Sequence, residues 1–117
     1  MRTAFSTLFR PGAVVAVRVR FAGREGIKLR PAVILSCAEY HASRADAVIV
    51  PLTSQMRASY FGDYDLVDWA AAGLPKVSRA KGVLETIERA MIEKTYGALS
   101  TRDLAGIKGS VRRILEI

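Results

Sequence analysis

Arg30-Pro31-Ala32-Val33-Ile34-Leu35-Ser36 places an arginine directly before an unbroken apolar run. A short continuous apolar run is typical of a strand that is buried on both faces, so we expect a strand over residues 31–36. The guanidinium of Arg30 matches the geometry of a phosphate group through two parallel hydrogen bonds. This stretch therefore predicts a core strand that begins beside a phosphate-binding side chain.

A second stretch, Pro51-Leu52-Thr53-Ser54, follows another apolar run, Ala47-Val48-Ile49-Val50, which also predicts a buried strand. Pro51 cannot donate to a ladder, so we expect it at the end of that strand or at a sheet edge. Thr53 then offers a hydroxyl group beside a turn. An arginine and a hydroxyl group of this kind, in a basic chain without a metal-binding motif, suggest a protein that handles a phosphodiester.

The chain has 117 residues, with 18 Lys and Arg against 11 Asp and Glu and a formal net charge of +7. Its length predicts one domain, which we place at residues 11–117 after a flexible leader at residues 1–10. The positive charge favours an anionic partner, whether nucleic acid, an acidic peptide or a membrane surface, and does not choose among them. The alternative is that the charge only keeps the protein soluble. No apolar run approaches the ~20 residues of a membrane-spanning helix, so we expect no membrane partner.

Cysteine and histidine offer little chemistry, because the chain has one of each. Cys37 has no partner for an intrachain disulfide, which fits a protein of the reducing cytoplasm, and we expect it to be a small, half-buried packing residue. His41 has Glu39 and Asp46 nearby, but without the spacing of metal ligands. We therefore expect no metal site and no cofactor, and we place His41 in an exposed loop.

Periodicity predicts three further elements before the C-terminal region. Apolar and basic residues alternate over residues 15–21, which predicts a half-buried strand whose basic side, with Arg18 and Arg20, faces water or a ligand. An aromatic-rich strand is expected over residues 60–66. Residues 69–75 are typical of one helical turn that a glycine and a proline end.

The C-terminal element is the clearest helix. Ser100-Thr101-Arg102-Asp103 has the form of a capping box, and apolar residues follow at helical spacing over residues 104–115. Gly106 and Gly109 weaken a helix by up to ~1 kcal/mol each relative to alanine, so its stability must come from docking. Residues 83–96 are ambiguous, and their composition and apolar spacing on their own favour a helix.

These blocks, in this order, resemble the PemK/MazF family of bacterial toxins from type II toxin–antitoxin systems. The resemblance runs from about Pro11 to Leu115, and Trp69 with Ala72-Gly73-Leu74 and Gly97-Ala98-Leu99-Ser100 add to it. It implies a mainly β fold with helices (α+β): a small, partly open SH3-like β-barrel with a C-terminal α-helix, usually as a homodimer. It also implies a strand within residues 83–96, and there we follow the resemblance against the local pattern.

The resemblance further implies an mRNA interferase, a metal-independent endoribonuclease that cuts single-stranded RNA and is blocked by an acidic antitoxin protein. Attack by the RNA's 2′-hydroxyl would leave a 2′,3′-cyclic phosphate and a 5′-hydroxyl. Arg30 is then expected to stabilise the charge on phosphorus, Thr53 to bond or orient the phosphate, and Glu25 to accept the 2′-hydroxyl proton or bond a base. A toxin of the same fold that poisons a topoisomerase such as gyrase, and a non-catalytic nucleic-acid-binding or antitoxin-binding relative, are the alternatives.

Residues near these positions are expected to contact RNA: Arg24, Lys28, Ser54, Gln55, Ser78, Arg79 and Lys81. Aromatic side chains are candidates for stacking on unpaired bases: Tyr60, Phe61, Tyr64 and Trp69, the last being more often a core residue. Each assignment has a plain alternative. Arg30 would cap a strand and pair with a carboxylate, Thr53 would bond nearby backbone, and the loop charges, Glu25 included, would be solvated.

Overall fold

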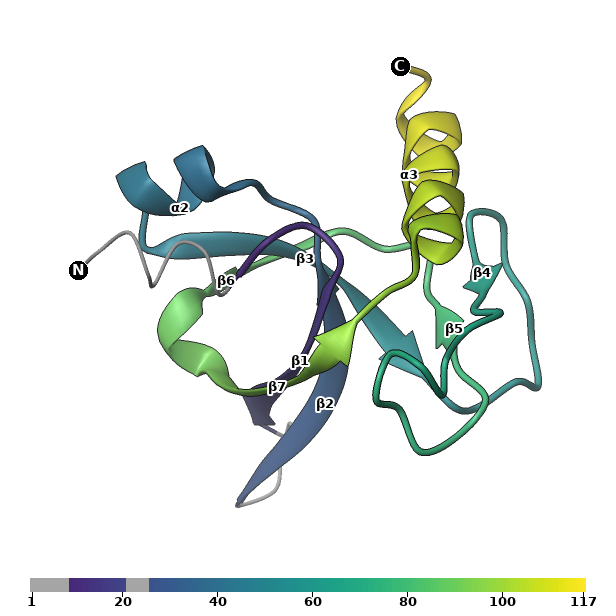
Figure 1. Ribbon diagram of the computed structural model, residues 1–117, viewed down its shortest axis with the longest axis horizontal. Helices are drawn as coiled ribbons and strands as arrows, with labels where there is room; N and C mark the ends of the chain where they lie inside the picture. The colour runs from purple at the N-terminus through teal and green to yellow at the C-terminus, as the bar shows by residue number, and fades with distance from the viewer. Residues whose placement is uncertain (1–8, 21–25) are drawn as a thin grey trace.

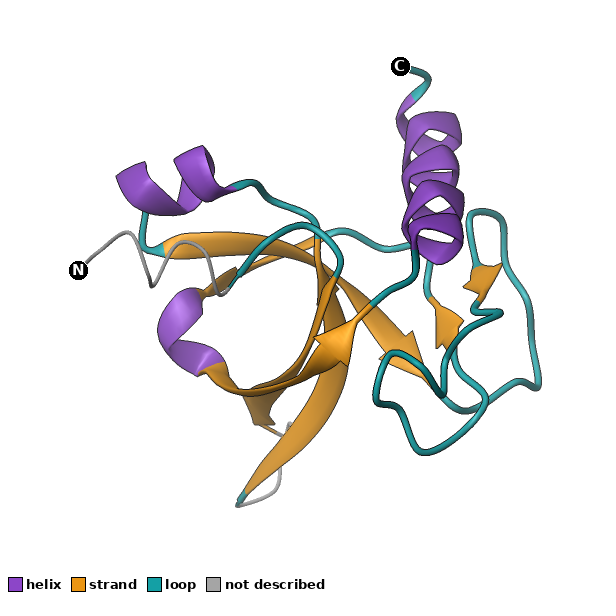
Figure 2. Cartoon of the chain, in the orientation of Figure 1, coloured by secondary structure: helices purple, strands orange, loops and turns teal. Residues whose placement is uncertain are grey.

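The computed structural model describes residues 9–20 and 26–117, which form a curled antiparallel sheet with a C-terminal helix standing beside it (Figures 1 and 2). In chain order the elements are β1 Ala13–Arg20, β2 Ile27–Ile34, α2 Ala38–Ser43, β3 Asp46–Thr53, β4 Tyr64–Asp65, β5 Arg79–Ala80, β6 Glu85–Glu88, the 3₁₀ turn η1 Arg89–Met91, β7 Ile92–Ala98 and α3 Thr101–Leu115. Arg24 and Glu25 lie outside the described residues.

The sheet has seven strands in the order β4-β5-β3-β2-β1-β7, with β6 also paired to β3. The first half of β3 pairs with β6 and its last two residues pair with β5, so β3 belongs to two ladders. The consecutive elements β6, η1 and β7 run from the β3 edge to the β1 edge and curl the sheet into an open barrel (Figure 1). This architecture confirms the predicted fold class.

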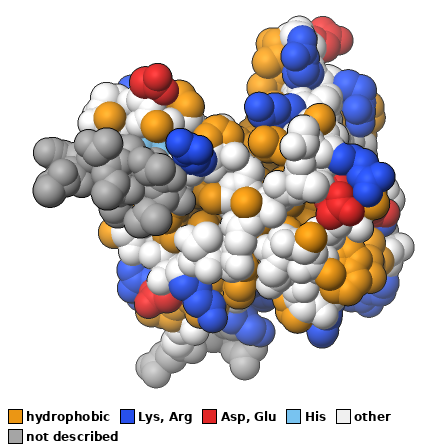
Figure 3. Space-filling view, viewed as in Figure 1, with side chains coloured by type: hydrophobic (Ala, Val, Ile, Leu, Met, Phe, Trp, Pro, Cys, Tyr) orange, Lys and Arg blue, Asp and Glu red, His pale blue; other side chains and the backbone are white. Residues whose placement is uncertain are grey.

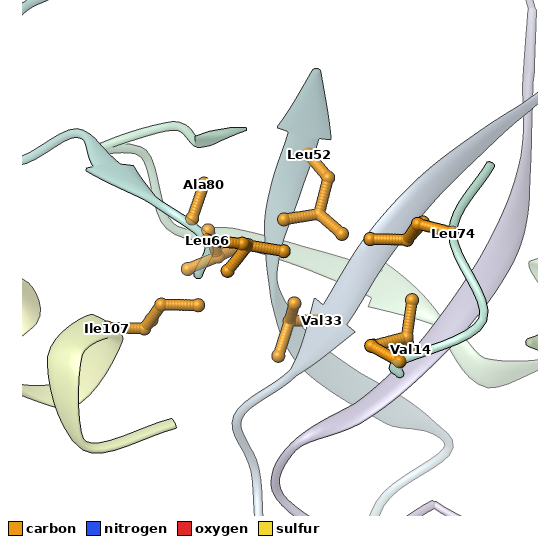
Figure 4. Packing of buried hydrophobic residues seen from close by; sticks show 9 residues of the cluster. Val14, Val33, Leu52, Leu66, Leu74, Ala80 and Ile107 are labelled. Carbon is orange, nitrogen blue, oxygen red and sulfur yellow. The ribbon is translucent and has the colours of Figure 1, made fainter. Parts of the chain in front are cut away.

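Apolar side chains cover both faces of the curled sheet. Inside the curl, a cluster built on Val15, Ala32, Ile34 and Ile49 packs together. On the outer face, a second cluster joins the sheet to α3 and to the chain between β4 and β5 (Figure 4), with members Val14, Val33, Val50, Leu52, Leu66, Ala72, Leu74, Ala80 and Ile107. The prediction that the apolar run of β2 is buried on both faces is thereby confirmed.

Several local predictions need correction. Residues 85–88 and 92–98 are strands, as the resemblance implied, so the helical interpretation of 83–96 is wrong because ladders to β3 and β1 override helix propensity. Pro51 lies inside β3, opposite Ala32, at the point where the β6 ladder ends and the β5 ladder begins. Its carbonyl accepts from the Lys81 amide at 3.0 Å.

The expected strand over residues 60–66 is reduced to β4. A hydrogen bond from the Asp63 amide to the Tyr60 carbonyl closes a turn there, and Gly62 has a φ of +92° that favours glycine. The alternation expected in β1 holds only at its end, because the residues from Ala13 to Val17 are buried on both faces. The helical turn after Asp68 forms as predicted and ends at Gly73, whose φ is +89°.

Helix α3 begins at the predicted cap, where the Ser100 hydroxyl accepts from the Asp103 amide at 3.1 Å. The Asp103 side chain does not complete a capping box. It is fully buried and turns toward the chain around β4. In the described part of the chain, no helix has the length and apolar character needed to cross a membrane.

Candidate active site

Arg30 and Thr53 occupy corresponding positions on neighbouring strands. The β2–β3 ladder ends with Ala32 opposite Pro51, and Arg30 and Thr53 each lie two residues beyond that pair. Because side chains alternate along a strand, both lie on the same side of the sheet as Ala32 and Pro51. In Figure 1 the two strands diverge at this end, β2 starting at the bottom of the view and β3 ending beside the chain between β4 and β5.

A groove with a volume of about 810 Å³ opens at this end of the sheet, and both side chains line it. Arg30 is exposed and Thr53 is partly exposed. The opposite wall is supplied by the chain between β4 and β5, through Leu74, Pro75 and Lys76. The groove therefore combines a guanidinium, a hydroxyl group and apolar walls within reach of solvent, which is the composition of a ligand site.

The Thr53 hydroxyl oxygen accepts the Gln55 amide at 3.0 Å. This is the local backbone bond that was the alternative for this residue, and it fixes where the hydroxyl oxygen lies. Among the described residues no acceptor takes the hydroxyl proton, so Thr53 can donate to a ligand while keeping its backbone bond. The two interpretations are compatible.

The charge of the groove is mostly positive. Its charged lining residues are Arg18, Arg20, Arg30, Lys76, Lys81 and Glu85. Arg18 is held in place by the Ala90 carbonyl at 2.7 Å and by Glu93, 3.3 Å away. The sequence list of contact residues omitted Arg18, Arg20 and Lys76. The basic side of the 15–21 alternation was the signal for the first two, whereas nothing local marked Lys76.

The other predicted contact residues fall into two groups. Ser54, Gln55, Ser78 and Lys81 line the groove, although Ser78 is buried and its hydroxyl donates to the Lys76 carbonyl at 2.8 Å. Lys28 is exposed in β2 and does not line the groove.

Arg79 has a structural role in this fold, and the expected contact with RNA stays a prediction for it. Its side chain is nearly buried, and its guanidinium donates to the Asp65 carboxylate and to the Ala58 carbonyl. The hydrogen bond from Arg79 lowers the pKa of Asp65, although partial burial opposes the shift. The pair ties β4 and β5 to the end of β3 and supports one side of the groove.

His41 is also a correction, because it lies in α2 and is only 2% exposed. Its Nε2 shares a 2.7 Å hydrogen bond with the Ser36 hydroxyl, which in turn accepts the Val48 amide at 2.9 Å. Burial and then the positive charge of Arg89 lower the pKa of His41. The residue is a neutral packing group at the opposite end of β2 from the groove.

Cys37 is exposed rather than half-buried. Among residues 9–20 and 26–117, no three His, Cys, Asp or Glu side chains gather closely enough to hold a metal ion.

Asp103 holds the groove wall to α3. Its carboxylate accepts from the Tyr64 hydroxyl at 2.8 Å and from the amides of Val67 and Asp68 at 3.0 and 2.8 Å. Burial, and then the hydrogen bond to Asp103, raise the pKa of Tyr64. The chain that continues from Asp68 to the groove is therefore anchored at the start of the helix, and sequence reasoning had assigned Asp103 only to the cap.

Solved structures with the same architecture define the class of fold. The chain is similar to MazF in a MazE–MazF complex from Deinococcus radiodurans, with a TM-score of 0.78, 22% identity and coverage of 94% of this chain and 97% of the other. It is similar to a mycobacterial endoribonuclease solved with its cognate antitoxin, with a TM-score of 0.73, 18% identity and coverage of 92% and 95%. A third similar structure is the toxin MazF-mt6 from Mycobacterium tuberculosis, with a TM-score of 0.68, 15% identity and coverage of 88% and 97%.

The family model of the PemK-like, MazF-like toxins of type II toxin–antitoxin systems matches residues 10–115. The chain belongs to this family. A search among curated proteins found no matching sequence.

Proposed function

We propose that this toxin is a metal-independent endoribonuclease that cuts single-stranded RNA at the groove between β2 and β3. The observation that carries the proposal is that Arg30 and Thr53, at matching positions on adjacent strands, line one open and mostly basic groove. Single-stranded RNA fits such a groove because its bases can be splayed and contacted one at a time.

The proposed reaction is an internal transfer within the RNA. The 2′-oxygen forms a bond to phosphorus, the bond from phosphorus to the 5′-oxygen breaks, and a 2′,3′-cyclic phosphate remains. Arg30 stabilises the added negative charge on the phosphoryl oxygens, and the Thr53 hydroxyl donates to one of them. The 2′-hydroxyl proton passes to the Glu25 carboxylate, to which we assign the role of general base, and the leaving 5′-oxygen takes up a proton from water.

We further propose an acidic antitoxin as the protein partner and a homodimer as the working form. The net charge of +7 and the basic lining of the groove support an acidic segment as the inhibitor. Two of the similar structures are complexes with an antitoxin, which supports the same partner here. Sedimentation of the purified protein, alone and with the antitoxin, tests both points.

The decisive experiment incubates purified protein with a mixed-sequence RNA in EDTA, beside the Arg30→Ala variant. We expect cleavage by the parent only, with 2′,3′-cyclic phosphate and 5′-hydroxyl ends identified by mass spectrometry. Intact RNA across a broad set of sequences would overturn the proposal. DNA breaks in the presence of a topoisomerase would then favour the poison, and salt-sensitive binding without cleavage would favour a non-catalytic relative.

A further inference from the structure

A second cavity of about 320 Å³ continues from the groove along the chain that follows β3. Thr53, Gln55 and Lys81 line both the groove and this cavity, so the two spaces adjoin at those residues. The outer part of the cavity is lined by Arg57, Ala58, Tyr60, Asp63 and Arg79. A strand bound at Arg30 and Thr53 therefore has a recess beside it on the β3 side.

Tyr60 presents an aromatic ring to solvent from a fixed backbone. The residue is 73% exposed, whereas its amide donates to the Asp63 carboxylate at 2.9 Å and its carbonyl accepts from the Asp63 amide at 3.0 Å. The turn packs against α3 so closely that a Cβ on Gly62 would meet Ile114 at 2.6 Å, and Figure 1 shows the turn beside that helix. Stacking on a ring held this way costs little conformational entropy.

The charges around Tyr60 suit a polyanion. Arg57 and Lys81 are exposed cations of the cavity lining, and Arg57 donates to the Gln55 side chain at 3.2 Å. The acidic residue of the lining, Asp63, accepts the Tyr60 amide at one carboxylate oxygen and the Gly82 amide at the other. Those two amides offset its negative charge locally, which leaves the recess attractive to phosphate groups.

We propose that Tyr60 is a base-stacking residue for the RNA strand that leaves the groove, with Arg57 and Lys81 contacting its phosphates. This inference rests on the proposed function for the identity of the ligand as RNA. An exposed aromatic ring next to cations is the combination that binds single-stranded nucleic acid without a fixed sequence. The continuity of the cavity with the groove favours RNA over a protein partner as the occupant.

Phe61 provides a matched control within the same turn. It is also 73% exposed, yet it does not line the cavity, and the guanidinium of Arg113 lies 5.8 Å from the centre of its ring. Removing Phe61 takes away an aromatic side chain of the same fractional exposure without touching the recess. A general effect of surface hydrophobicity would therefore appear in both variants, and stacking only in Tyr60→Ala.

The test measures binding of a mixed-sequence RNA that carries 2′-O-methyl groups throughout, so that the internal nucleophile is blocked. Tyr60→Ala should weaken binding by about 5- to 150-fold, the range for losing one stacked base. Tyr60→Phe and Phe61→Ala should bind like the parent. Because Tyr60→Ala removes no charge, it should keep the salt dependence of binding. Arg57→Ala and Lys81→Ala should each reduce the slope of the logarithm of the binding constant against the logarithm of the salt concentration by about 1.

Equal binding by Tyr60→Ala and Tyr60→Phe would overturn the stacking role, as would an equal loss in Phe61→Ala. If Tyr60→Ala bound an acidic peptide more weakly than the parent but bound RNA equally well, the surface would belong to a protein partner and the stacking role would also be overturned. Cleavage of unmodified RNA is measured separately on the parent. If the parent does not cleave RNA but its RNA binding depends on Tyr60, the proposed nuclease activity is wrong and the stacking role stands. If the parent cleaves RNA but its binding does not depend on Tyr60, the stacking role is wrong and the nuclease activity stands.

Discussion

The two ends of β2 and β3 carry polar residues under opposite conditions. At the groove end, Arg30 is exposed and Thr53 keeps a hydroxyl proton for a ligand. At the other end, the half-buried Ser36 hydroxyl shares a hydrogen bond with the buried ring of His41 and accepts the Val48 amide. Buried polar groups that satisfy each other hold a fold together, whereas exposed ones that converge on a cavity are available for chemistry.

The largest expected effect is on the rate of RNA cleavage, and it comes from a substitution at the groove end of β2. Arg30→Ala should lower the rate of RNA cleavage by about 100- to 1000-fold, because it removes a charged donor from the developing negative charge. Its thermal unfolding should match the parent. Arg44→Ala is the control for net charge, since Arg44 lies at the end of α2 with its guanidinium 5.7 Å from the Tyr40 ring. Equal loss of cleavage in both variants would reduce the role of Arg30 to general attraction.

The next effect concerns stability at the buried end. His41→Ala should destabilise the protein by roughly 2–4 kcal/mol, because it removes a packed ring and the hydrogen bond between that ring and the Ser36 hydroxyl. Urea unfolding measures the change in the free energy of unfolding. The cleavage rate per folded molecule should stay at the parent value, and a selective loss of cleavage would place His41 in the reaction instead.

A smaller effect is expected at the hydroxyl of the groove. Thr53→Val should slow cleavage by about 10- to 150-fold, because one hydrogen bond to a charged group is worth about 1.5–3 kcal/mol. Thr53→Ser keeps the hydroxyl and should stay near the parent. Single-turnover cleavage assays on both variants decide the matter, and a slow serine variant would indicate that the methyl group of Thr53 matters more than its oxygen.

The smallest effect is a pH dependence of stability. His41 has a lowered pKa in the folded protein against an ordinary value of 6.5, so the unfolded chain binds its proton more readily. Its contribution is complete above pH 6.5 and is lost as the pH falls from there through the folded pKa. Urea midpoints measured between about pH 7 and about pH 5 should fall in the parent and fall less in His41→Asn.

The acidic side chains act in a separate and lower range. The pKa of Asp65 is lowered by its hydrogen bond to Arg79, and that of Asp68 by hydrogen bonds from Ser100 and Arg102. Their contribution is present above the ordinary value of 3.8 and is lost as the pH falls through the folded values. A parent without any change in stability between about pH 7 and about pH 5 would contradict the neutral, buried assignment of His41.

Sequence patterns predicted the groove better than its surroundings. The apolar runs after Arg30 and before Thr53 predict two strands. Once those strands pair, strand periodicity places the two side chains on the same side of the sheet. Arg79, like Arg30, comes directly before a small apolar residue, yet Arg79 is buried. Its guanidinium is held by the Asp65 carboxylate and the Ala58 carbonyl, which belong to residues distant in the sequence. No local pattern distinguishes these two arginines.

The local sequence of β6 and β7 predicted a helix wrongly, for a related physical reason. The composition of these segments favours a helix only weakly. Pairing with β3 and β1, which lie far away in the sequence, overrides that preference. The resemblance to a known family supplied that long-range information. His41 shows the same limit, since its burial depends on packing against Phe9, with ring centres 6.5 Å apart, and on Arg89.

Gly106 has a consequence for how the protein folds. A Cβ at this position would lie 2.2 Å from the ring of Tyr64, so the glycine lets that ring lie against the helix and reach Asp103. The same glycine makes α3 a poor helix in isolation. We therefore expect the fifteen-residue helix α3 to become stable only when it docks on the sheet, and the groove wall that Asp103 anchors to become ordered in the same step.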